Sequence, residues 1–74
     1  MQADEKIELD KQEKEKFGIP PKCKAYRFIL EKVIEERCDE FDYELEELGF
    51  TIADRDMKNV ATSIYTYNVV AYKD

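Results

Sequence analysis

Residues 22–48, KCKAYRFILEKVIEERCDEFDYELEEL, decide which fold the chain is expected to adopt. From Leu30 onward the apolar residues recur at steps of four, four, three, four and three, which is the spacing of one face of an α-helix. This apolar stripe consists of Leu30, Ile34, Cys38, Phe41, Leu45 and Leu48. The pattern therefore predicts an amphipathic helix over residues 22–48 that packs on the rest of the chain through the stripe.

The residues on either side indicate where this helix begins and ends. Pro20 disfavours helical geometry before it, and Pro21 suits a first helical turn because its missing N–H would have no partner there. Gly49 suits a left-handed helix end, and Phe50 can fold back onto the last turn. An unbroken helix of this length would measure about 40 Å. The alternative is a break near Asp39, which can cap a new helix.

The remainder of the chain predicts β-structure. Residues 50–53 suit a short strand, residues 54–59 a polar connection, and residues 60–72, VATSIYTYNVVAY, a long strand rich in β-branched and aromatic residues. The long strand carries apolar residues on both faces, so alternation selects no inner face. We expect either that both faces are covered, as in an oligomer, or that a bulge switches the register.

The N-terminal residues 1–18 are interpreted as a charged tail or a short strand, because Ile7 and Leu9 alternate with charged residues. Residues 19–74 are expected to form a single small domain, since a chain of 74 residues has room for one. The expected fold class is α+β: one long, or once-broken, amphipathic helix packed on a small antiparallel hairpin or sheet.

A mismatch in strand length predicts a homodimer. The strand expected at residues 60–72 is much longer than its partner at residues 50–53, so residues 67–72 would lack a neighbour on that side. Unpaired strand edges favour pairing with another strand. The N-terminal segment or a second copy of the chain would fill the gap.

The net charge of −6 is unevenly spread. Residues 31–74 carry twelve acidic and five basic side chains, which argues against direct binding of nucleic acid and favours a basic protein partner. The sequence has neither the roughly 20 consecutive apolar residues that a membrane span needs nor the apolar core of a secretory signal. We expect no membrane partner and a cytoplasmic location.

Carboxylates line up on the predicted helix. At 100° per residue, five of them fall within an arc of about 80° and form an acidic ridge beside the apolar stripe. The ridge consists of Glu31, Glu35, Asp39, Asp42 and Glu46, and a second row consists of Glu36, Glu40 and Glu47. Like charges three or four residues apart destabilise a helix, so folding energy does not explain the arrangement.

Three functions are compatible with this acidic surface, besides the simple role of keeping the chain soluble. The first is a regulatory module that binds another protein. The second is a nucleic-acid mimic, of the type phages encode against basic proteins of an infected cell, because residues 35–47 place eight carboxylates along about 18 Å of helix, close to the spacing of charges on duplex DNA. The third is a structural or assembly subunit.

Tyrosines are the second candidate for partner binding. Tyr65 and Tyr67 point to the same face of a regular strand, and Tyr72 lies further along it. Tyrosine is frequent in interfaces because its ring is apolar and its hydroxyl is polar. We interpret the three either as half-buried residues of the sheet or as contacts with a partner or a second copy.

The chemistry of the side chains indicates a protein that is not an enzyme and holds no metal or cofactor. The chain has no histidine, and two cysteines cannot complete a structural zinc site. On one helix Cys23 and Cys38 would lie about 22 Å apart, too far for a disulfide, so both are expected to be free and buried. Ser63 has no histidine to activate it.

Overall fold

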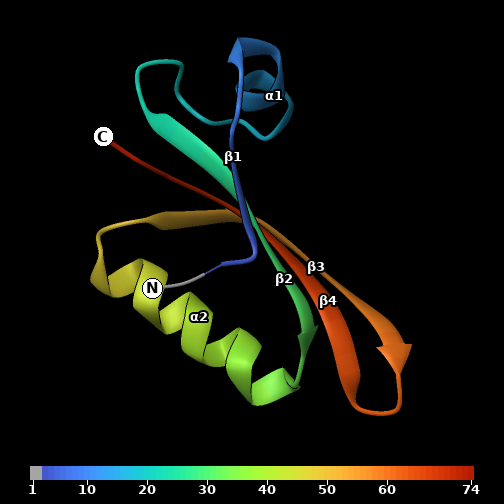
Figure 1. Ribbon diagram of the computed structural model, residues 1–74. Coiled ribbons are helices and arrows are strands. Elements are labelled where there is room, and N and C mark those ends of the chain that lie inside the picture. Colours follow the sequence, from blue (N-terminus) through green and yellow to red (C-terminus); the bar gives the residue numbers. More distant parts are fainter. Residues whose placement is uncertain (1–2) are drawn as a thin grey trace.

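The computed structural model describes residues 3–74 as an α+β fold with a four-stranded antiparallel sheet and two helices (Figure 1). The strands lie in the order β1-β2-β4-β3. The elements are β1 (Glu5–Glu8), α1 (Lys11–Lys16), β2 (Lys24–Val33), α2 (Glu35–Glu47), β3 (Thr51–Ala61) and β4 (Ile64–Lys73). Because β2 and β3 both run antiparallel to β4, they are parallel to each other, and α2 connects them.

The prediction of one helix over residues 22–48 is wrong, because its first part is the strand β2. Tyr26, Phe28 and Leu30 alternate along β2 and face α2, whereas Ala25 is buried on the opposite face. A central strand covered on both faces carries apolar residues at neighbouring positions. The step from Leu30 to Ile34 therefore matches a helical spacing by coincidence, and Pro21 lies in a turn before β2 rather than at the start of a helix.

The helix α2 has 13 residues and is uninterrupted, so the alternative of a break near Asp39 is also wrong. The change of structure occurs at Ile34, whose extended backbone caps α2 without a side-chain hydrogen bond. The C-terminal end is as predicted. Gly49 has a φ of 88°, and the N–H of Phe50 donates to the carbonyl of Leu45, which is the hydrogen-bond pattern of a glycine-terminated helix.

The C-terminal strands differ from the prediction in where they turn. Residues 54–59, expected as a polar connection, are the middle of β3, and the hairpin turn lies at Thr62 and Ser63. Ser63 adopts the left-handed backbone with a φ of 58°. A left-handed turn residue that is neither glycine nor asparagine gives little signal in a sequence.

This arrangement removes the mismatch on which the expected homodimer was based. Strand β4 pairs with β2 on one side and with β3 on the other, and Tyr72 has partners on both: Ala25 and Thr51. Residues 67–72 therefore have no free edge. The N-terminal segment does pair with the sheet, but with β2, where Ile7 lies opposite Arg27.

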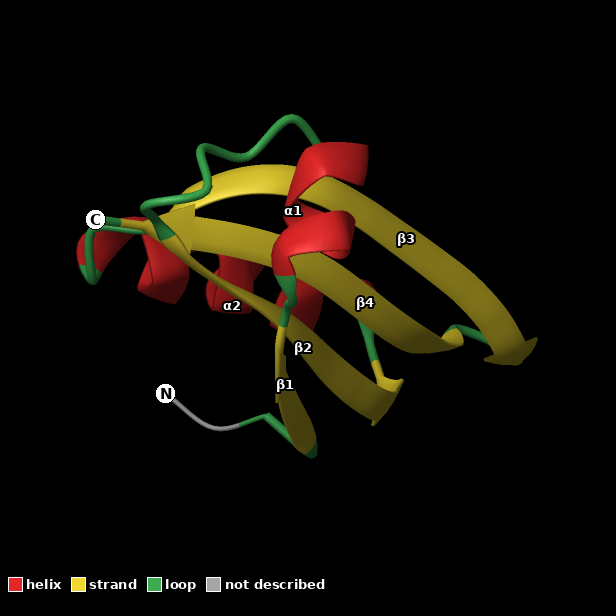
Figure 2. Cartoon of the chain, turned by 90° about the horizontal axis from the view of Figure 1, so that it is seen from above, coloured by secondary structure: helices red, strands yellow, loops and turns green. Residues whose placement is uncertain are grey.

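The sheet has a core on each face, and the two helices lie on opposite sides of it (Figure 2). Phe28 and Phe41 meet edge to face in the larger core, beneath α2. On the other face, Leu9, Ile19 and Cys23 from the connection between β1 and β2 form a smaller core. Both faces of β4 are therefore covered within one chain. The register shifts place their extra residues in the neighbouring strands β2 and β3, so the expected bulge in β4 itself does not occur.

Candidate functional site

The outer side of α2 carries a continuous acidic surface. Eight of its 13 residues are acidic and one, Arg37, is basic. Since Cys38, Phe41 and Leu45 face the sheet and are buried, most of the remaining side chains face outward or sideways. The exposed carboxylates, here called the acidic face, belong to Glu35, Glu36, Asp39, Glu40, Glu46 and Glu47.

Two residues of the predicted ridge lie elsewhere. Glu31 is on β2, where its backbone N–H donates a hydrogen bond of 2.6 Å to Asp4, so it does not continue the row on α2. Asp42 is on α2 but is turned toward the sheet and is only partly exposed. The ridge of five is therefore reduced to Glu35, Asp39 and Glu46, and the second row keeps all three of its predicted members.

Asp42 has a structural role. It accepts a hydrogen bond of 2.5 Å from the hydroxyl of the buried Tyr67 on β4, and its other oxygen lies 3.5 Å from the guanidinium of Arg55 on β3. Burial raises the pKa of Tyr67, and the hydrogen bond to Asp42 and its negative charge raise it further. One carboxylate thus links α2 to two strands.

Sequence reasoning missed the two apolar side chains that interrupt the acidic surface. Tyr43 is 64% exposed and Leu48 is 50% exposed. Tyr43 lies in the outermost row of the helix, together with Glu36, Glu40 and Glu47, and the steps of four, three and four between these residues were a signal for this. Leu48 was expected in the buried stripe, but the helix ends there and its side chain lies in solvent.

A hollow of about 260 Å³ lies between these residues, lined by Tyr43, Glu44, Glu47 and Leu48. One oxygen of Glu44 is 3.7 Å from the guanidinium of Arg37. Its other oxygen is buried and accepts no hydrogen bond from any residue in the described range 3–74. The hollow therefore combines apolar walls with two carboxylates, which suits a long cationic side chain such as lysine or arginine.

The three tyrosines of β4 do not form one surface. Tyr67 is buried beneath α2, and Tyr65 is half-buried on the same face near the start of α2. Tyr72 is half-buried on the opposite face, against the smaller core. The exposed tyrosine is Tyr43 on α2, not one on the strand.

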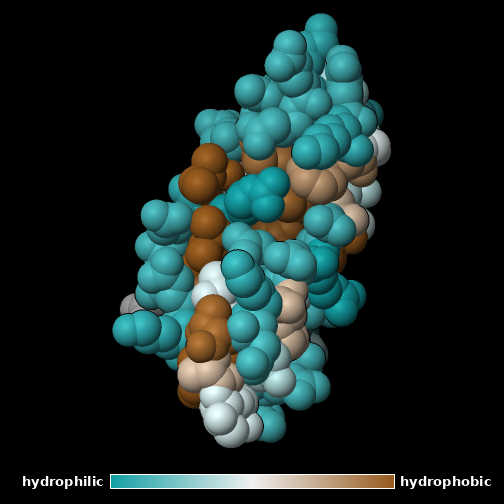
Figure 3. Space-filling view, turned by 90° about the vertical axis from the view of Figure 1, so that its right-hand side faces the viewer, coloured by the Kyte–Doolittle hydropathy of each residue, from teal (hydrophilic) through white to brown (hydrophobic). Residues whose placement is uncertain are grey.

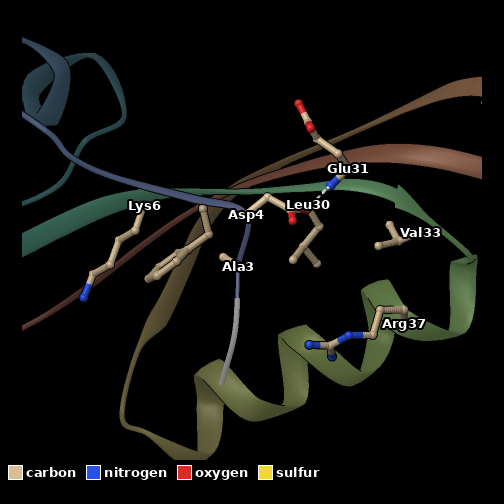
Figure 4. A pocket seen from close by; sticks show the side chains of 8 residues that line it. Ala3, Asp4, Lys6, Leu30, Glu31, Val33 and Arg37 are labelled. Carbon is tan, nitrogen blue, oxygen red and sulfur yellow. Dashed lines mark hydrogen bonds between the residues drawn. The ribbon is translucent and has the colours of Figure 1, made fainter.

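A larger groove, of about 640 Å³, separates the start of β1 from α2 (Figure 4). Its floor is apolar, with Phe28, Leu30 and Val33. Lys6 and Arg37 lie on opposite sides of it in Figure 4, while Asp4 and Glu31 contribute negative charge. Because the groove carries charges of both signs, it favours neither an anionic nor a cationic ligand.

The thiols lie in different cores and are free. The pKa of Cys23 is raised by burial and by its contact with Asp74, and the pKa of Cys38 is raised by burial and by nearby carboxylates, so neither favours the reactive thiolate. Over residues 3–74, no cluster of three or more histidine, cysteine, aspartate or glutamate side chains has a geometry that could hold a metal ion.

Comparison with known proteins adds no relative: no family model matches the chain, and no curated protein or solved structure is similar enough to count as a match. None of the helices in the described residues is long and apolar enough to cross a membrane.

Proposed function

We propose that this chain is a non-enzymatic interaction module that binds a basic protein surface through the outer side of α2. The observation that carries the proposal is Tyr43, a large aromatic side chain that is 64% exposed in the middle of a helix with eight carboxylates. A helix whose outer side only had to stay soluble would not need an aromatic ring there. Tyrosine is enriched at the centres of protein interfaces, where it often contributes much of the binding energy.

The charges of α2 supply orientation and the apolar side chains supply contact area. Six exposed carboxylates surround Tyr43 and Leu48. They attract a basic partner over several ångströms and accelerate its association, an effect that salt weakens. In the hollow beside Tyr43, a lysine or arginine of the partner would place its stem against Tyr43 and Leu48 and its charge near Glu44 and Glu47.

The experiment compares tagged variants in an affinity capture from cells that express the chain. Tyr43→Ala and Glu47→Lys should lose a basic protein that the unchanged chain retains. The matched control is Glu15→Lys on α1, which is also exposed but lies on the other side of the sheet. Circular dichroism and thermal unfolding check that each variant is folded.

The captured protein is then purified and its dissociation constant is measured by calorimetry. Tyr43→Ala should raise this constant by at least tenfold, and Glu47→Lys should raise it mainly through slower association. If the same proteins bind with the same affinity whether or not α2 is altered, the proposal is wrong.

A nucleic-acid mimic is the second candidate, favoured by the spacing of the carboxylates. Residues 35–47 form an uninterrupted helix, and eight carboxylates over about 18 Å correspond to one per about 2.3 Å, compared with about 1.7 Å per charge on duplex DNA. This function requires that the partner itself bind nucleic acid. Duplex DNA should then displace the chain from the captured protein, and Tyr43→Ala should matter less than Glu36→Lys or Glu40→Lys.

A further inference from the structure

Strand β3 forms a long edge of the sheet. Its inner side pairs with β4, and its outer side has no partner strand among residues 3–74. It has 11 residues, compared with four in the other edge strand, β1. Register shifts occur between Ile52 and Asp54 and between Asn59 and Ala61, so the segment from Asp54 to Asn59 is the regular part of this edge.

We propose that this edge pairs with the same edge of a second copy of the chain, in antiparallel orientation, with Met57 on the two-fold axis. The proposal does not depend on the function assigned to α2. It also differs from the dimer expected from the sequence, which required a free edge on residues 67–72.

Symmetry restricts how two identical edges can pair. An antiparallel pair of identical edge strands is related by a two-fold axis perpendicular to the sheet, because only that rotation reverses both the strand direction and the outward direction of the edge. Each residue then faces the residue that lies equally far on the other side of the axis. Residues that face each other must also share a face of the sheet, so one residue always faces its own copy directly across the axis. This residue is described below as lying on the axis.

The charges and the extent of the regular segment together select the register. With Asn59 on the axis, Lys58 and Met57 would face Val60 and Ala61, which lie outside the regular segment. With Asp54, Arg55, Asp56 or Lys58 on the axis, a charged side chain would face its own copy, and like charges directly opposite each other destabilise a sheet. With Met57 on the axis, Asp56 of each copy faces Lys58 of the other, which gives two attractive pairs and no repulsive one.

The remaining neighbours in this register are also compatible. The side chain of Met57, which is 40% exposed, would pack against Met57 of the second copy. This contact would lie on the face of the sheet that carries α2, because Met57 lies opposite Tyr67 in the β3–β4 ladder. Arg55 would face Asn59, so it can keep its ion pair with Asp42. The pairs of Asp56 with Lys58 and of Arg55 with Asn59 both fall within the regular segment between the two register shifts.

The surface around the β3–β4 hairpin suits a partner that binds by main-chain strand pairing. In Figure 3, apolar side chains on this side occur in small groups separated by hydrophilic ones, not as one broad apolar area. Strand pairing needs no such area, because main-chain hydrogen bonds supply the affinity and alternate side chains the register. A second copy supplies both.

The first test is sedimentation equilibrium of the full chain at about 0.15 M salt. Lys58→Glu places a carboxylate opposite Asp56 in each of the two pairs and should raise the dissociation constant of the dimer by about tenfold or more. Asp56→Lys should do the same. The double variant D56K/K58E restores both attractive pairs with exchanged signs and should return the dissociation constant close to that of the unchanged chain.

The second test measures the register. In antiparallel pairs, opposing Cα atoms lie about 4.5–5.5 Å apart, within the range of a disulfide. Met57→Cys should therefore form a covalent dimer under mild oxidation. Asn59→Cys, which lies two positions from the axis and would be about 14 Å from its copy, should not, and the unchanged chain controls for Cys23 and Cys38.

The outcomes are unambiguous. A chain that remains monomeric at high micromolar concentration overturns the proposal. A dimer that is unaffected by Lys58→Glu, or one that forms the disulfide at position 59 but not at 57, also overturns it, because the contact or the register would then be another one. None of these results bears on binding through α2.

Discussion

The hydroxyl of Tyr67 donates a hydrogen bond of 2.5 Å to the carboxylate of Asp42, joining β4 to the middle of α2. Asp42 also lies 3.5 Å from Arg55 on β3, so α2 is fixed to both strands of the hairpin at one point. This link turns one acidic side chain of α2 toward the sheet and leaves the acidic face to be formed by the others.

Replacing Tyr67 by phenylalanine should therefore destabilise the protein without altering its core packing. Phe fills the same space but leaves Asp42 without one donor, and a hydrogen bond to a charged group contributes about 1.5–3 kcal/mol. Because Arg55 still pairs with Asp42, we expect the lower part of that range. Urea unfolding measures the change. Tyr43→Phe, at an exposed position, should alter the free energy of unfolding by less than about 0.5 kcal/mol.

The stability conferred by Tyr67 should decrease at high pH. Burial and the contact with Asp42 raise the pKa of Tyr67 above its ordinary value of about 10. The folded state therefore retains the phenolic proton more tightly than the unfolded state, and the stabilisation is complete below about pH 10 and is lost as the pH rises above it.

The measurement is the difference in unfolding free energy between the unchanged chain and Tyr67→Phe. This difference should be constant near neutral pH and should shrink above about pH 10. The raised pKa values of Cys23 and Cys38 act in the same direction, but they are common to both chains and cancel in the comparison. A difference that grows with pH would contradict the assignment.

Two leucines of the predicted apolar stripe should respond differently to truncation. Leu45 is fully buried between α2 and the sheet, whereas Leu48 is half exposed. Leu45→Ala should cost about 2–5 kcal/mol, because it leaves a cavity in the core. Leu48→Ala should cost less than about 0.5 kcal/mol. Thermal unfolding of the two variants, measured together, checks this, and equal losses would mean that Leu48 belongs to the core.

One substitution in the hairpin turn should stabilise the protein. Ser63 has a φ of 58°, a left-handed conformation that residues with a β-carbon adopt at a cost of about 1 kcal/mol or more. Ser63→Gly should therefore raise the free energy of unfolding by about 0.5–1 kcal/mol. Thr62→Gly is the control: Thr62 is not among the left-handed residues, so glycine there should give no gain. A loss of stability in Ser63→Gly would refute the turn geometry.

Local sequence was sufficient for features whose physics is local. Gly49 followed by Phe50 identified the end of α2, because a left-handed glycine and the hydrogen bond from Phe50 to Leu45 involve only neighbouring residues. The buried positions Cys38, Phe41 and Leu45 followed from helical spacing. The acidity of residues 35–47 also required no knowledge of the fold.

The tertiary structure decided where the sheet lies and which side chains remain exposed. Residues 24–33 fit the two-residue period of a strand and also the helical period of about 3.6 residues. Tyr26, Phe28 and Leu30 alternate as in a strand, while Leu30 and Ile34 are spaced as in a helix. Strands β1 and β4 supply hydrogen-bond partners on both sides of this segment, and α2 covers its apolar face, so it forms a strand. Hydrogen bonding between distant segments cannot be read from spacing alone, and for the same reason only the folded chain shows that Asp42 points inward to Tyr67.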